Sequence, residues 1–289
     1  MTSVVCWLNN DIWYPGIWAV SDSRVSSSAG SMTDSLPKLF AVPANVYEGD
    51  GKITRQNPTK ILSVGFGFAG STLIGVSVKD ILALCLDNLS EIAYYDTKGV
   101  LDIPSKDRVP ALDEVALLTK KIAEKYLLSM GFCHPQGAVC EIVVFGYCVR
   151  TESNRVFVIK NHPEAPSDLI IDEVPINEGV YVVLGDKREE VLEMIYAKNK
   201  VCISEPYCEG RGPIVALQQI IKNSSSPTIG GFVQICMTTR FTARTMYLSD
   251  DSSCILPLLG FDVIKDFGSL GGFSFDFSPS LSINKNLME

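Results

Sequence analysis

Short runs of hydrophobic residues recur along the chain, and turn-forming residues separate them. The first two runs, Val4 to Leu8 and Ile17 to Val20, predict strands, because Asn, Asp, Pro and Gly residues between them favour a turn. Similar runs predict further strands at 38–42, 61–68, 138–149, 155–159, 169–171, 180–184, 232–238 and 244–248. The pattern therefore indicates a chain rich in β-strands.

Four other segments carry apolar residues at helical spacing: 71–89, 112–128, 188–197 and 213–222. In the second of them, Leu112, Val115 and Leu118 begin an apolar face. Asp113 and Glu114 near its start suit the positive end of a helix dipole. The order of elements is strands, two helices, strands, two helices and strands. This order predicts an α+β fold with helices on the outer faces of two stacked sheets.

Composition narrows the classes of function. The chain has 289 residues, of which 46% are hydrophobic and 20% charged, so it can fill a core. Its net charge of −8 argues against a nucleic-acid binder and against a surface held to anionic lipid. The length leaves open one large domain or two small ones.

The termini and the cysteines indicate a soluble cytoplasmic protein. The first residues have no basic region followed by an apolar one, so we expect no secretory signal. The nine cysteines lie mostly in apolar runs and form no CxxC pair, which favours buried thiols in a reducing compartment and no zinc site. The uncharged stretch Ile61 to Val78 contains four glycines, and we interpret it as a buried strand followed by a buried helix rather than a membrane span.

A glycine-rich motif lies where a predicted strand meets a predicted helix. Residues 65–70 fit G-x-G-x-x-G, and Asp87 follows at a spacing that a dinucleotide site uses. However, Asp87 lies late in the same helix, not at the end of the next strand. Two other interpretations remain. The glycines can allow close backbone approach, or their amides can point at an anion or oxyanion.

The N-terminus offers a nucleophile. Thr2 follows Met1 and is small enough for Met1 to be removed, which would leave a free amine beside the Thr2 hydroxyl. A terminal amine has a pKa of about 7.7–8.0, so it can act as a base near neutral pH. A hydroxyl needs such a base to become a nucleophile. The sequence thus allows Thr2 to carry both groups.

Three charged residues can support that chemistry. Asp22 and Arg24 follow the second predicted strand, and Lys38 begins the next one sixteen residues after Asp22. A lysine near the Thr2 amine would lower the pKa of that amine by repulsion. A buried lysine needs an anionic partner, and Asp22 can be that partner.

These residues carry a resemblance to a known family. The segments 2–5, 21–24, 38–40 and 67–71 resemble the N-terminal nucleophile (Ntn) hydrolases of the proteasome β-subunit type. The likeness is greatest to the bacterial Anbu and betaproteobacterial proteasome-homologue groups, and it extends through Leu184 to Lys187. The resemblance implies a four-layer αββα sandwich formed by a single domain, 1–289, with the tail 260–289 as an interface extension.

The resemblance also implies roles for individual residues. Thr2 would be the nucleophile and its amine the base, with Lys38 tuning that amine and Asp22 and Arg24 supporting Lys38. The Gly70 amide would donate to the oxyanion. Two departures concern the residues that orient the N-terminus: 226–231 lacks the usual Asp, and Asp186 replaces a usual Ser.

The function that follows is a threonine-type peptidase in a self-compartmentalising ring. Its substrate would be a peptide or an unfolded protein, its contact surfaces the helices at 71–89 and 112–128, and an ATPase unfoldase a further partner. No cofactor, metal, nucleic acid or membrane is expected. The alternatives are a non-catalytic ring or scaffold subunit, an Ntn amidase acting on a small amide, and a dinucleotide binder.

Overall fold

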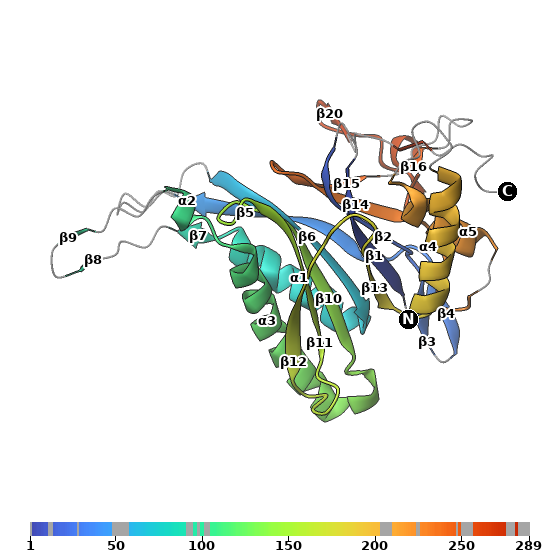
Figure 1. The fold of residues 1–289 in the computed structure, drawn as a ribbon, viewed down its shortest axis with the longest axis horizontal. Coiled ribbons are helices and arrows are strands. Elements are labelled where there is room, and N and C mark those ends of the chain that lie inside the picture. The colour runs from blue at the N-terminus through green and yellow to red at the C-terminus, as the bar shows by residue number, and fades with distance from the viewer. Residues whose placement is uncertain are drawn as a thin grey trace.

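The computed structural model describes most of the chain. The described residues are 2–10, 14–27, 29–47, 58–90, 95–96, 99–100, 105–202, 210–223, 226–246, 248–249, 257–275 and 281–282. They form a mixed α+β fold built around two β-sheets (Figure 1). All structural statements below concern these residues.

The first sheet has five strands in the order β13-β1-β2-β14-β15. These strands are β1 (Ser3–Asn9), β2 (Gly16–Ser21), β13 (Tyr181–Gly185), β14 (Gln234–Thr238) and β15 (Ala243–Met246). Every pairing in it is antiparallel. In the pairing of β1 with β13, Ser3 lies opposite Gly185, so the start of the chain meets the end of β13.

The second sheet has six strands in the order β12-β11-β10-β6-β5-β7. These are β5 (Leu39–Tyr47), β6 (Thr59–Gly70), β7 (Leu89–Ser90), β10 (Cys140–Cys148), β11 (Ser153–Asn161) and β12 (Leu169–Val174). The β10–β6 pairing places Cys140 opposite Gly70 and Glu141 opposite Ala69. The end of β6 therefore lies beside the start of β10.

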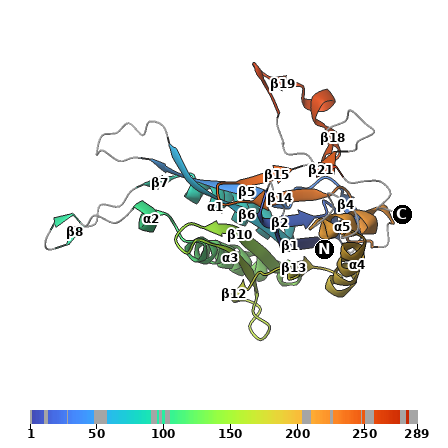
Figure 2. The ribbon, with the colours of Figure 1, turned by 45° about the horizontal axis from the view of Figure 1, so that its top comes forward.

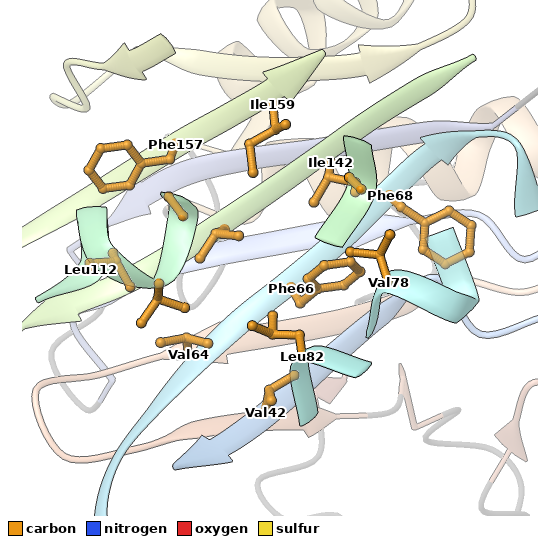
Figure 3. Packing of buried hydrophobic residues seen from close by; sticks show 14 of the residues in the cluster. Val42, Val64, Phe66, Phe68, Val78, Leu82, Leu112, Ile142, Phe157 and Ile159 are labelled. Atoms are coloured by element: carbon orange, nitrogen blue, oxygen red, sulfur yellow. The ribbon is translucent and has the colours of Figure 1, made fainter. Parts of the chain in front are cut away.

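Two helices pack on the six-stranded sheet. They are α1 (Thr72–Leu86) and α3 (Leu112–Cys133), shown beside β5, β6 and β10 in Figure 1. Apolar side chains from both helices, such as Leu82 and Leu112, form one buried cluster with Phe66 and Ile142 of the sheet (Figure 3). Burial of these side chains holds the helices to the sheet, at roughly 1.5–3 kcal/mol for each large apolar side chain.

Two further helices pack on the five-stranded sheet. They are α4 (Arg188–Cys202) and α5 (Gly212–Lys222), and they form a second cluster with side chains such as Trp7 and Trp18. A third cluster joins the sheets themselves: Val4 and Ala19 of one pack with Val143 and Phe145 of the other. Two helices thus pack on each sheet, and the mixed α+β class that the sequence predicts is present.

The predicted elements differ from the observed ones mainly at their ends. Helix α3 extends five residues beyond the predicted end at Leu128, and Met130 in this extension packs on the first cluster. The polar segment 21–35 contains a short hairpin, β3 (Val25–Ser27) with β4 (Gly30–Thr33). The sequence also predicts a linker at 96–110 and a polar connection at 47–58. The first contains a short helix, α2 (Ser105–Arg108), and the second lies largely outside the described residues.

The remaining short elements belong mainly to the C-terminal part. They are β8 (Tyr95–Asp96), β9 (Gly99–Val100), β16 (Leu248–Ser249), β17 (Pro257–Leu258), β18 (Phe261–Asp262), β19 (Ser269–Leu270), β20 (Phe273–Ser274) and β21 (Leu281–Ser282). Figure 2 shows β18 and β19 extending away from the two sheets. Among the described helices, none is long and apolar enough to cross a bilayer. The stretch 61–78 instead forms strand β6 and the first half of α1.

Candidate active site

The first residues of the chain lie between two strands of the five-stranded sheet. Thr2 is 6% exposed and Ser3 is fully buried. The Asp186 N–H donates to the Thr2 carbonyl over 2.9 Å, and Gly185 lies so close that a Cβ there would be 1.7 Å from that carbonyl oxygen. Gly185 also has a φ of +89°, a backbone conformation that favours glycine. The end of β13 therefore fixes the Thr2 backbone, and only glycine fits at position 185.

Asp22 lies at the centre of a buried hydrogen-bond network. It follows β2 directly and is fully buried. Its Oδ1 accepts from the Ser3 N–H at 3.0 Å and from the Lys38 Nζ at 3.1 Å. Its Oδ2 accepts from the N–H groups of Arg24 and Gly230, both at 3.1 Å. One carboxylate oxygen thus joins Lys38 to the residue next to Thr2.

Lys38 is a buried cation. It precedes β5, is 1% exposed, and its Nζ donates to the Asp22 carboxylate and to the Arg24 carbonyl at 2.5 Å. Burial lowers the pKa of Lys38, and the Asp22 carboxylate opposes that change. Burial likewise raises the pKa of Asp22, while the Lys38 ammonium and the Ser3 and Gly230 N–H groups oppose that rise. The two groups need each other, because either one alone would be an uncompensated buried charge.

Arg24 contributes through its backbone, whereas its side chain points elsewhere. The guanidinium makes a two-point ion pair with Asp34, with Nε–Oδ1 at 2.7 Å and Nη2–Oδ2 at 3.0 Å. That pairing raises the pKa of Arg24 and lowers the pKa of Asp34. The guanidinium also lies against Gly230, where a Cβ would be 2.3 Å from Arg24 Cζ. Arg24 therefore contacts the Asp22–Lys38 pair through its backbone N–H and carbonyl groups and not through its side chain.

Gly70 ends β6 at the turn into α1. Its φ is +87°, and a Cβ there would be 2.6 Å from the Val139 carbonyl oxygen, so the turn requires glycine. Its neighbour Ala69 packs in the inter-sheet cluster with Val4 and Leu184. The turn therefore lies at the end of the sheet near the start of β1.

The other two glycines of the motif serve packing. Gly65 and Gly67 lie inside β6, where a Cβ would be 2.2 Å from the Phe145 ring and 2.7 Å from Leu39 Cδ2, respectively. Phe145 and Leu39 are the cross-strand partners of these glycines in the same sheet, so the missing side chains make room for the side chains of their partners. A phosphate-binding loop has its glycines in a turn before a helix, so the arrangement of Gly65 and Gly67 disfavours the dinucleotide interpretation.

Gln234 is a supporting residue that sequence reasoning missed. Its Oε1 accepts from the N–H groups of Lys38 at 2.7 Å and Leu39 at 3.2 Å, and its Nε2 donates to the Leu36 carbonyl at 2.7 Å. This amide fixes the backbone of Lys38 to β14 of the other sheet. A lone Gln in an apolar strand gives no local signal of such a role, because its partners lie 195 to 198 residues away in the sequence.

Ser226, in the stretch that lacks the expected Asp, caps its own turn. Its Oγ accepts from the N–H groups of Thr228 at 3.3 Å and Ile229 at 3.2 Å. These bonds shape the turn that leads to Gly230, whose N–H reaches Asp22. The contribution of this stretch to the site thus includes a backbone amide.

The arrangement combines a small hydroxyl residue with a buried ammonium and a positive-φ turn. A cation near the start of the chain favours the neutral form of a nearby amine and stabilises negative charge on a nearby oxygen. Of the residues that the sequence singled out, Asp22, Lys38 and the Arg24 backbone lie in one hydrogen-bond network with Ser3, beside Thr2. Such a set can support attack by a hydroxyl on an acyl carbon.

Comparisons with known proteins place the fold. No family model and no curated sequence matches the chain. The structure is similar to that of the helical assembly of the Anbu complex from Pseudomonas aeruginosa, with a TM-score of 0.51 and 12% identity over 87% of this chain and 89% of that one.

Two other Anbu structures match with lower scores. A mutant of Anbu from Hyphomicrobium sp. strain MC1 has a TM-score of 0.49 and 10% identity, over 87% of this chain and 88% of that one. Anbu, described as an ancestral beta-subunit, from Yersinia bercovieri has a TM-score of 0.46 and 14% identity, over 84% and 81% of the two chains. The likeness to the Pseudomonas structure confirms, at the level of the fold, the resemblance expected from the sequence.

Proposed function

We propose that this chain is an N-terminal nucleophile hydrolase of the threonine-peptidase type. The observation that carries the proposal is the buried ion pair of Lys38 with Asp22, in which the same Asp22 oxygen accepts from the N–H next to Thr2. A buried ammonium is costly, so one that is linked through Asp22 to the residue after Thr2 is a candidate for a functional role. Activation of Thr2 accounts for that position.

The proposed reaction uses groups of the chain alone. With Met1 removed, the Thr2 Oγ attacks the carbonyl carbon of a peptide bond and passes its proton to the Thr2 amine. The Gly70 N–H donates to the oxyanion that forms. The C–N bond then breaks and the leaving amine takes that proton from the Thr2 ammonium. Water hydrolyses the ester on Thr2, which releases the acid and restores the hydroxyl. Lys38 keeps the Thr2 amine neutral before the attack, because a nearby positive charge lowers the pKa of an amine.

The layered arrangement supports the same proposal. We infer that the two sheets with outer helices form the αββα sandwich of this hydrolase class, as a single domain. The support is that three apolar clusters separate helix, sheet, sheet and helix. The fold shared with the Pseudomonas Anbu structure agrees with this inference.

The state of residue 2 tests the proposed function. Intact-mass analysis of the purified chain should show Thr2 as the first residue, and that protein should cleave quenched fluorogenic peptides. Periodate cleaves an N-terminal threonine only when its amine and hydroxyl are both free, so brief treatment should remove the activity, because it destroys nucleophile and base together. A cleaving protein that keeps its full rate after complete conversion of Thr2 contradicts the proposal.

A non-catalytic scaffold subunit is the second candidate function. The observation that favours it is Ser226, which bonds within its own turn in the stretch where the family has an orienting Asp. Retained Met1, or a free Thr2 without hydrolysis of any substrate, would support the scaffold. A panel of acyl substrates of different sizes separates a peptidase from an amidase that accepts only a small amide.

We also propose that the chain assembles with copies of itself. The helices α1 and α3 expose large apolar side chains: Leu73, Leu84, Leu117, Leu128 and Phe132, the last of which is 92% exposed. Apolar residues gathered on one face of a molecule mark interaction surfaces. The helical assembly of the Pseudomonas Anbu complex agrees with such a role.

Native mass spectrometry checks the assembly. We expect a mass of several subunits for the wild-type chain, and a shift toward smaller species for Leu128→Glu combined with Phe132→Glu, because charges on this surface oppose burial. The matched control is Phe241→Glu, which alters an apolar residue that is 84% exposed outside the two helices. A wild type that stays monomeric at all concentrations contradicts assembly, and so a self-compartmentalising ring.

A further inference from the structure

Glu141 is a carboxylate at the edge of the inter-sheet layer. Side chains of a strand alternate between its two faces. In β10, Ile142 and Val144 face the helices, while Val143 and Phe145 face the other sheet. Glu141 therefore faces the other sheet, and its side chain is 19% exposed. An acidic residue in this position needs partners for its charge.

Those partners come from the turn that follows β13. The Gly185 N–H donates to Glu141 Oε2 over 2.7 Å, and Arg188 Nη2 makes a short contact with Oε1. Arg188 Nε also donates to the Gly185 carbonyl at 3.2 Å. The three residues form a closed set of contacts that ties β10 of the six-stranded sheet to the 185–188 turn of the other sheet.

The same turn holds the start of the chain. Gly185 lies opposite Ser3 in the β1–β13 ladder, and Asp186 donates to the Thr2 carbonyl. In the β10–β6 ladder, Glu141 lies opposite Ala69. A Cβ added to Gly185 would be 3.4 Å from the Ala69 Cβ, so Gly185 also lies close to this pair. Ala69 precedes Gly70. Glu141 thus connects the end of β13, which holds Thr2, with the end of β6, which forms the Gly70 turn.

The contacts of Glu141 differ from those of an ordinary surface ion pair. Arg155 and Glu173 form such a pair on the six-stranded sheet, with Nε–Oε1 at 2.7 Å and the Glu173 side chain 48% exposed. Both oxygens of Glu173 accept from the Arg155 side chain. Glu141 uses one oxygen for a backbone N–H next to the Thr2 contact, so its loss frees a backbone segment as well as a charge.

We propose that Glu141 is a positioning residue for Thr2. It holds the 185–188 turn against β10, and this turn fixes the Thr2 carbonyl. The position of the carbonyl sets the direction of the Thr2 amine and hydroxyl relative to the Gly70 turn. This inference rests on the proposed hydrolase function. Glu141 acts through Gly185 and Asp186 and takes no part in the bond changes.

Steady-state kinetics test the role. Glu141→Ala should lower kcat about 10–100-fold, with KM changed less than about 2-fold, because a small misplacement of a reacting group slows the chemical step. Glu141→Gln keeps an oxygen that can accept from the Gly185 N–H, so it should recover most of kcat. The matched control, Glu173→Ala, breaks a Glu–Arg pair away from the site and should leave kcat unchanged. Full kcat in Glu141→Ala overturns the positioning role while the hydrolase proposal stands.

Hydrogen exchange gives a second readout that needs no activity. The amides of Gly185 and Asp186 should exchange at least about 10-fold faster in Glu141→Ala than in the wild type, because the turn opens more readily. Unchanged exchange at both amides overturns the inference. A wild type without hydrolysis contradicts the proposed function, and with it the catalytic part of this inference, while exchange still decides whether Glu141 holds the turn.

Discussion

Thr2→Ala is expected to abolish peptide hydrolysis, with kcat/KM at least ~10³-fold below the wild-type value. Removal of a nucleophile leaves only substrate binding and oxyanion stabilisation, which together give a small residual rate. Alanine keeps the amine and the backbone contacts, so the loss isolates the hydroxyl. Initial rates with a fluorogenic peptide, at equal concentrations of protein with matching intact mass, measure the effect.

Thr2→Ser is the matched control. Serine keeps the hydroxyl beside the amine, and we expect it to retain measurable activity well above that of Thr2→Ala. Thermal unfolding should show all three proteins folded, because both substitutions keep the backbone contacts of residue 2, such as the bond from the Asp186 N–H. An active wild type whose Thr2→Ala form cleaves at the same rate would exclude Thr2 as the nucleophile.

Lys38→Met is expected to lower the free energy of unfolding by about 3–5 kcal/mol and to remove activity. The substitution leaves the Asp22 carboxylate fully buried with no opposing charge, and breaking a buried pair from one side has this cost. Urea unfolding followed by far-UV circular dichroism measures the stability. Lys160→Met is the control, because the Lys160–Asp172 pair is partly exposed, so its loss should cost less than about 1 kcal/mol.

The double variant Asp22→Asn with Lys38→Met separates pairing from packing. If the two charges stabilise each other, the double variant should lose less free energy than the sum of the single variants, by at least about 1 kcal/mol. Strict additivity would mean that the two side chains act independently. It would contradict the buried ion pair on which the proposed function depends.

The loss of unfolding free energy caused by Lys38→Met should become smaller as the pH falls. Burial raises the pKa of Asp22, so the folded state binds a proton at a higher pH than the unfolded state does. The contribution of Asp22 to stability therefore falls as the pH rises through this range. In the Lys38→Met variant no ammonium opposes this rise, so the pKa of Asp22 in the folded state should increase further. Unfolding at ~pH 5 and ~pH 8 checks this: a deficit that is larger at the lower pH contradicts the assignment.

Periodicity in the sequence was sufficient for most elements of the fold. Alternating or continuous apolar runs predicted β1, β2, β6 and β10, and helical spacing predicted the start of α3 at Leu112, where Glu114 accepts from the Ala111 N–H at 2.8 Å. These signals are local, because a strand or helix buries a face that its own residues define. The short helix α2 gave no such signal, because four residues are too few to show a period.

The site was predictable only where spacing and residue type coincide. The need of a buried lysine for an anionic partner, together with the family resemblance, indicated that Asp22 pairs with Lys38, and the structure brings the two to 3.1 Å. The partner of the Arg24 side chain was not predictable, because several acidic residues lie within reach of it in the sequence. Only the hairpin of β3 and β4 brings Asp34 to Arg24.

The sequence by itself determined most of the segments that form strands and helices, and which residues can supply a nucleophile, a cation and its counter-ion. The tertiary structure decided how these groups are held. Gln234 reaches Lys38, Gly230 reaches Asp22, and Glu141 reaches Gly185, each from a segment far away in the chain. The physical reason is that buried polar groups take their partners from whichever strand the packing of the two sheets brings within hydrogen-bond distance, and no local pattern records that choice.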